Sequence, residues 1–123
     1  MPKFDLHHLH HKAADIEKTA SWYVDCLGAT ESGRKGDRII DVDLHGVRIR
    51  ISAFHPESPT EQAYGLEHLS LDTDDLSGVI ERLKSNGTPF KEERDADGKM
   101  SCYATGPDGA VIYIMQGHPG HKY

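Results

Sequence analysis

The chain has 123 residues, of which 37% are hydrophobic and 28% are charged, and this size allows one compact domain with a core of its own. Its formal net charge of −6 argues against non-specific binding to nucleic acid, which needs a basic surface. The sequence contains no apolar run long enough to span a bilayer, no secretory leader at its start and no cysteine spacing typical of a disulfide framework or a zinc site, so we expect a cytoplasmic protein that does not act at a membrane.

The first half of the chain predicts a strand, a helix and three further strands. Residues 7–13 alternate, with His8 and His10 on a polar face and His11 on an apolar face, where it would have a structural role. An aspartate-capped amphipathic helix follows and ends at Gly28. Its expected inward positions are Ile16, Ala20, Tyr23, Val24 and Leu27. The later strands, the last two joined by a tight turn at His45-Gly46, are expected at 29–34, 39–44 and 47–51.

The second half repeats this order after a linker. Residues 55–65 contain two prolines and no periodicity, which is typical of a connector. A strand at 66–73 then places His68 on its polar face, and a second aspartate-capped helix ends at Asn86-Gly87. Three more strands are expected at 88–93, 100–105 and 110–115. The polar residues 117–123 are typical of a flexible tail.

Equivalent positions recur at a nearly constant spacing. His8 and His68 are 60 positions apart, and Gly28 and Gly87 are 59 apart. An internal duplication is the simplest account, and it places the two histidines at related positions around a pseudo-twofold axis. The domain would then consist of two modules and a linker, at 5–54, 66–116 and 55–65.

Three segments carry a resemblance to a known family: HLHHKAADIEKTASWYVDCLGA, EHLSLDTDDLSGVIERLKSNG and GPDGAVIYIM. They are similar to the two halves of a vicinal oxygen chelate protein, the superfamily of glyoxalases, bleomycin-resistance proteins and extradiol dioxygenases. The resemblance implies an α+β fold of two βαβββ modules that form an open, barrel-like cup, the glyoxalase-like fold. It also implies a divalent metal ion (Zn, Fe, Ni or Mn), a small-molecule substrate and a homodimer.

The metal ligands that the resemblance implies are only partly present. Family enzymes typically supply two ligands from the first strands of the modules, which His8 and His68 match, and two from the last strands. The last-strand positions, usually carboxylates or glutamine, align with Arg50 and Tyr113. A guanidinium stays protonated and cannot bind a metal, and a phenol with a pKa near ~10 is a poor ligand. His10 could complete a three-histidine site or contact the substrate.

Arg50 and Tyr113 each admit a functional and a structural interpretation. Antiparallel pairing across the His45-Gly46 turn sets Asp41 opposite Arg50, which predicts a cross-strand ion pair. In the cup, Arg50 could also clamp a substrate carboxylate or phosphate while Asp41 orients it. Tyr113 would face the same cup, either as a catalytic acid/base or as an aromatic filler of the space that a carboxylate leaves.

Two main classes of function remain open. The first is a metal-dependent lyase, isomerase or dioxygenase, in which a metal on His8 and His68 chelates a small oxygenated substrate. The second is a metal-free binding protein of the bleomycin-resistance type, which sequesters a small molecule without transforming it. An accessory ligand-binding domain without catalysis is a third. All three predict a small-molecule partner.

Overall fold

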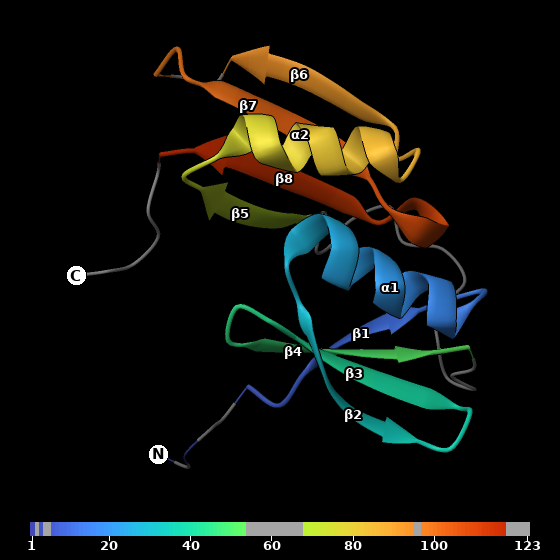
Figure 1. The fold of residues 1–123 in the computed structure, drawn as a ribbon. Helices are drawn as coiled ribbons and strands as arrows, with labels where there is room; N and C mark the ends of the chain where they lie inside the picture. The colour runs from blue at the N-terminus through green and yellow to red at the C-terminus, as the bar shows by residue number, and fades with distance from the viewer. Residues whose placement is uncertain (2, 4–5, 54–67, 95–96, 118–123) are drawn as a thin grey trace. The chain divides into compact units, whose positions relative to one another are not determined.

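The chain folds as two similar units. The structure, a computed structural model, describes residues 1, 3, 6–53, 68–94 and 97–117. The chain divides into Met1–Ser58, here named module one, and Pro59–Tyr123, named module two. Each has a strand, a helix and three further strands (Figure 1), so the predicted βαβββ repeat is confirmed. The predicted linker and residues 118–123 of the predicted tail lie outside the described residues.

Module one is a four-stranded mixed sheet with one helix. Its elements are β1 (Leu9–Lys12), α1 (Ile16–Leu27), β2 (Thr30–Lys35), β3 (Ile39–Leu44) and β4 (Val47–Ser52). The strand order is β1-β4-β3-β2, with β1 parallel to β4 and the other neighbours antiparallel. Helix α1 packs across one face of this sheet.

Helix α1 has the predicted ends but a different buried face. The Asp15 carboxylate accepts a hydrogen bond from the backbone N–H of Lys18, and Gly28 closes the helix with a φ of 72°. The prediction that Val24 faces inward is wrong. The buried face of the helix includes Trp22 and Cys26, on the side of Tyr23 away from Val24, so Val24 is 37% exposed. The buried residues are Thr19, Ala20, Trp22, Tyr23, Cys26 and Leu27.

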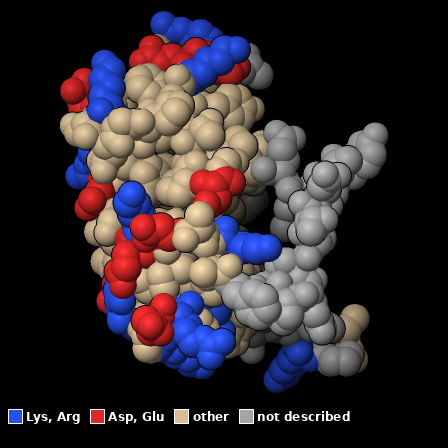
Figure 2. All heavy atoms as spheres, turned by 90° about the vertical axis from the view of Figure 1, so that its right-hand side faces the viewer, with Lys and Arg blue, Asp and Glu red and all other residues tan. Residues whose placement is uncertain are grey.

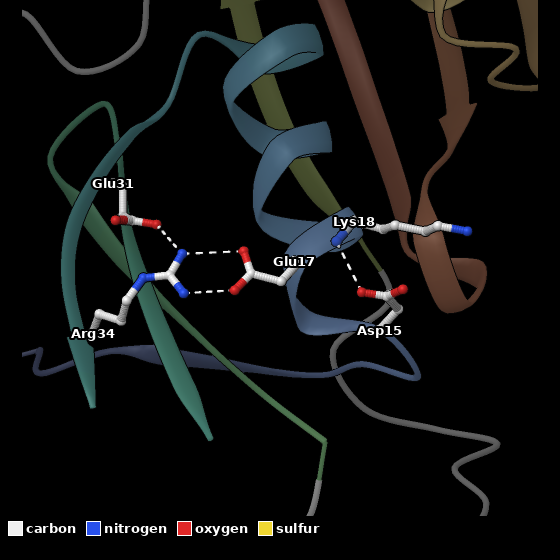
Figure 3. Close-up of polar contacts among 5 residues, drawn as sticks. All are labelled: Asp15, Glu17, Lys18, Glu31 and Arg34. Atoms are coloured by element: carbon white, nitrogen blue, oxygen red, sulfur yellow. Dashed lines mark hydrogen bonds and ion pairs between the residues drawn. The ribbon is translucent and has the colours of Figure 1, made fainter. Parts of the chain in front are cut away.

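An exposed ion-pair cluster joins α1 to β2. Figure 3 shows the Arg34 guanidinium donating two hydrogen bonds to the Glu17 carboxylate of α1 and one to Glu31 on its own strand. Hydrogen bonds from Arg34 lower the pKa of Glu17. Because all three side chains are solvent-exposed, the cluster fixes geometry more than it adds stability.

The two faces of the module-one sheet differ in chemistry. The face against α1 carries the core residues Ile40, Val42, Leu44, Ile49 and Ile51, none more than 4% exposed. His11 lies on this side, where its Nδ1 and the Tyr23 hydroxyl share a hydrogen bond of 2.9 Å. The structural role predicted for His11 is therefore confirmed. The opposite face is polar and contains the predicted site residues of this module.

The β3–β4 hairpin forms at the predicted turn. His45 and Gly46 have φ values of 51° and 99°, the positive values that a type I′ turn requires at both positions. The His45 ring reaches back to α1, where Nε2–H donates to the Leu27 carbonyl at 2.6 Å. This bond satisfies one of the backbone acceptors left free at a helix C-terminus.

Module two repeats the architecture with a second core. Its elements are β5 (Leu69–Thr73), α2 (Leu76–Ser85), β6 (Phe90–Arg94), β7 (Met100–Thr105), a short 3₁₀ turn (Pro107–Gly109) and β8 (Val111–Gln116). The order is β5-β8-β7-β6, with β5 parallel to β8. Asp75 caps α2, which buries Leu76, Ile80 and Leu83. Within the described residues, no helix is long and apolar enough to cross a membrane.

Candidate functional site

The polar face of module one brings three predicted site residues together. The register of β1 with β4 places His10 beside Arg50, and the register of β3 with β4 places Asp41 on the other side of Arg50. Because residues directly opposite each other in a sheet share a face, these side chains form one row across three strands. The next row on this face comprises Lys12, Ser52, Ile39 and Lys35.

The ion pair between Asp41 and Arg50 is formed as predicted. Arg50 Nε donates to Asp41 Oδ1 at 2.9 Å and Nη2 donates to Oδ2 at 3.0 Å. The side chains are only 20% and 15% exposed, so water screens the pair weakly. Hydrogen bonds from Arg50 lower the pKa of Asp41, and the same bonds raise the pKa of Arg50. The guanidinium is thus charged and held in one orientation.

His8 lies directly before β1 rather than within it. The predicted strand 7–13 is shorter, because pairing with β4 begins at Leu9. His8 Nδ1 shares a hydrogen bond of 2.7 Å with His7 Nδ1, and its ring centroid is 6.1 Å from that of His10. Desolvation lowers the pKa of His8, and the charge of Arg50 lowers it further. The imidazole is therefore mostly neutral near pH 7.

His10 makes its own contact on the same face. Its Nε2 and the Ser52 hydroxyl share a hydrogen bond of 2.8 Å, which ties β1 to the end of β4. Ser52 is buried, whereas His10 is exposed. The sequence assigned no role to Ser52, because nothing local shows which strand lies beside β1.

Module two places the other two predicted site residues in an aromatic cluster. His68 lies directly before β5, as His8 does before β1. Its ring lies edge-on to those of Tyr103 and Tyr113, with centroids 5.9 and 6.0 Å away. The two tyrosine rings are 4.5 Å apart and tilted by 35°. Tyr113 therefore packs against two other rings of module two, and its role, as a filler or as an acid/base, stays a prediction.

Tyr103 belongs to this aromatic cluster, and the sequence analysis assigned it no role. It lies directly opposite Tyr113 in the β7–β8 register. Thr105 and Val111 flank the turn between these strands, and counting two positions away from the turn on each strand gives this pair. The counting that predicted the Asp41–Arg50 pair would therefore have found it.

Comparison with known proteins identifies the family. The family model described as the Glyoxalase/Bleomycin resistance protein/Dioxygenase superfamily matches residues 5–114. The chain belongs to this superfamily. The resemblance inferred from the three sequence segments is therefore confirmed. A search of curated protein sequences finds no match.

Solved structures of superfamily proteins share the fold at low identity. The fosfomycin resistance protein FosX from Listeria monocytogenes matches with a TM-score of 0.73 and 24% identity, covering 92% of this chain and 90% of that one. A glyoxalase family protein from Enterococcus faecalis matches with a TM-score of 0.66 and 26% identity, covering 91% and 97%. Lactoylglutathione lyase from Agrobacterium tumefaciens matches with a TM-score of 0.67 and 16% identity, covering 95% and 96%. The predicted glyoxalase-like α+β class is confirmed.

One of the similar solved structures contains a metal ion. In this chain, the potential metal ligands described within each module are poorly suited to binding such an ion. A FosX mutant, 22% identical to this chain, is complexed with Mn(II) and 1S,2S-dihydroxypropylphosphonic acid. In the described part of this chain, no group of three or more His, Cys, Asp or Glu side chains could hold an ion. In module one Asp41 binds Arg50, whose positive charge opposes a cation beside His8. Structural and catalytic zinc sites usually have three or four protein ligands, and the described residues of neither module supply them.

Proposed function

We propose that this superfamily member binds a small anionic, oxygenated molecule on the polar face of module one without a metal ion. The observation that carries the proposal is Arg50, which Asp41 holds at the position where the family resemblance implies a metal-binding carboxylate. The ion pair uses Nε and Nη2, and among the described residues no contact of Nη1 is present, which leaves its two N–H donors for a ligand. Carboxylate and phosphate groups match the donor geometry of a fixed guanidinium.

The local charge supports an anionic ligand. The chain as a whole is acidic, and Figure 2 shows Asp and Glu side chains interspersed with Lys and Arg on the face in view. On the polar face of module one and its β2–β3 turn, however, cations outnumber carboxylates. The cations are Lys12, Lys35, Arg38, Arg48 and Arg50, and the carboxylates are Asp37, Asp41 and Asp43. Such a local excess raises the concentration of anions at the surface.

A charge-removing variant tests this proposal. We expect Arg50→Met to weaken binding of butyrate or methylphosphonate at least about tenfold, the loss of one charge-assisted contact. Binding of the neutral analogue butyramide would change little. Titration followed by NMR of ¹⁵N-labelled protein measures all three affinities. Lys84→Met, which removes an exposed cation from α2, is the matched control. Equal losses for the anions and the amide would contradict the clamp.

A metal-dependent lyase, isomerase or dioxygenase is the second candidate. Its support is the equivalent placement of His8 and His68, each directly before the first strand of its own module. In this candidate the two histidines bind a divalent metal (Zn, Fe, Ni or Mn), His10 contacts the substrate or adds a ligand, and Tyr113 acts as an acid/base.

Elemental analysis separates the two candidates. Protein purified with stoichiometric metal, which the His8→Ala, His68→Ala double variant loses, would support the metal-dependent enzyme. Metal-free protein that binds anions equally well with and without both histidines would support the binding protein.

A further inference from the structure

A pocket adjoins the Arg50 row on the polar face of module one. One side is formed by the hydrogen-bonded pair of His10 and Ser52. The other side comes from the β2–β3 hairpin, with Lys35, Asp37 and Arg38. Its lining thus contains two cationic side chains and one carboxylate.

The hairpin sets the two cations at the ends of one short turn. The backbone N–H of Arg38 donates to the Lys35 carbonyl at 3.2 Å, which closes the turn. Lys35 then stands beside Ile39, and Ile39 beside Ser52, in a row across β2, β3 and β4. The pocket therefore has an apolar side chain between its cationic side and its serine.

The pocket row lies one step along the strands from the Arg50 row. Arg50 and Ser52 lie two positions apart on β4, which corresponds to about 7 Å along the same sheet face. His10 belongs to the Arg50 row and also lines the pocket, so the two places are continuous. Lys35 also lies two strands across the sheet from β4, about 10 Å to the side. The long side chains of Arg50, Lys35 and Arg38 would have to cover most of this separation, with a ligand spacer of a few carbon atoms covering the rest.

We propose that this pocket is a second anion subsite and that the ligand carries two anionic groups joined by a short apolar spacer. The inference rests on the function proposed above, which supplies the first anion contact at Arg50. Lys35 and Arg38 bind the second group, Ile39 contacts the spacer, and the His10–Ser52 pair offers hydrogen bonds beside it. Short dicarboxylates and phosphorylated carboxylates share this chemistry.

Glutarate and butyrate test the subsite, because they have similar short apolar chains and differ by one carboxylate. We expect the wild-type protein to bind glutarate at least about tenfold more tightly than butyrate in NMR titrations, a gain typical of one added charge-assisted contact. The Lys35→Met, Arg38→Met double variant should bind glutarate only as tightly as butyrate, and butyrate itself should weaken much less than glutarate, because it loses only the attraction of the local positive charge. Arg50→Met should weaken both, and Lys84→Met neither. Phosphoglycolate in place of glutarate distinguishes a phosphate from a carboxylate as the second group.

The two proposals fail differently in this experiment. Butyrate binding that depends on Arg50, with no advantage for glutarate, would overturn the subsite and leave the anion clamp standing. A glutarate advantage that survives the double variant would also overturn the subsite. If neither acid binds the wild-type protein, both proposals are wrong. Lys35 and Arg38 are exposed, so the variants should retain the native circular dichroism spectrum.

Discussion

Arg50 owes its orientation to one neighbour, Asp41, and this makes the site pH-dependent. The pKa of Asp41 is lowered in the folded protein by hydrogen bonds from Arg50, so the ion pair stabilises the fold above the unfolded carboxyl pKa near ~3.9. That contribution is lost as the pH falls through the lower, folded pKa. We expect Asp41→Asn to reduce the free energy of unfolding by about 1.5–3 kcal/mol at pH 7.

The difference between Asp41→Asn and wild type should shrink as the pH falls below about 4 and vanish once the native carboxyl is protonated. Urea unfolding at a series of pH values measures it. Glu81→Gln, an exposed carboxylate on α2, provides the control. A difference independent of pH would mean that the ion pair does not account for the stability.

Tyr113 offers a second test on a single side chain. Its ring packs against Tyr103 and His68, so Tyr113→Phe keeps the packing and removes only the hydroxyl. If Tyr113 is a filler, we expect Phe to change stability by less than about 1 kcal/mol. Tyr113→Ala should destabilise more, because the aromatic contacts are lost. A hundredfold loss of turnover in the Phe variant, at unchanged stability, would instead identify an acid/base.

Helix α2 depends on its N-cap. The Asp75 carboxylate accepts the backbone N–H of Gly78 at 3.0 Å, and the helix has only ten residues. Asp75→Ala should therefore lower the free energy of unfolding by about 1 kcal/mol, while Asp75→Asn, which keeps an acceptor, should cost less. Thermal unfolding measures both. Asp74→Ala removes the adjacent carboxylate without touching the cap, and an equal loss there would contradict the capping role.

The strand bounds were predicted best where an alternating apolar pattern ends at residues typical of a turn. β3 (Ile39–Leu44) and β7 (Met100–Thr105) have the predicted bounds, and β4 begins at the predicted residue after the His45-Gly46 turn. The first strand of module one is shorter than its alternating pattern, because β1 pairs with β4 only from Leu9. Alternation shows which side chains share a face, not where the partner strand ends.

The same limit explains which site contacts could be predicted. Counting from a hairpin turn gave the Asp41–Arg50 pair, since the two residues lie nine positions apart on adjacent strands. The His10–Ser52 bond spans 42 positions and depends on the parallel pairing of β1 with β4. The pattern of neighbouring residues in the sequence does not predict that pairing. The His45 bond to Leu27 likewise requires the packing of a turn on a helix end.

For the whole molecule, the family resemblance predicts a homodimer. The mass of one chain is 13.7 kDa. We expect size-exclusion chromatography with light scattering to give twice this mass at micromolar concentration. A mass of one chain at all concentrations would contradict the prediction.

Each module contains one buried cysteine, which allows their unfolding to be followed separately. Cys26 and Cys102 are 1% and 0% exposed, and burial raises the pKa of Cys102 to about 11. A buried thiol with this pKa reacts slowly with alkylating reagents, because the thiolate is the reactive form. Alkylation of either residue therefore reports the opening of its module.

We expect both cysteines to become reactive at the same urea concentration. A module of about 60 residues buries too little surface to be more than marginally stable alone, so cooperation between the two should favour one transition. Pulsed alkylation followed by peptide mass spectrometry measures the two midpoints in a single sample. Cys26→Ala and Cys102→Ala variants show whether modification of one thiol alters the other. A lower midpoint for either cysteine would mean that the duplicated modules unfold as two domains, whereas a shared midpoint would make them the single domain that the length of the chain predicts.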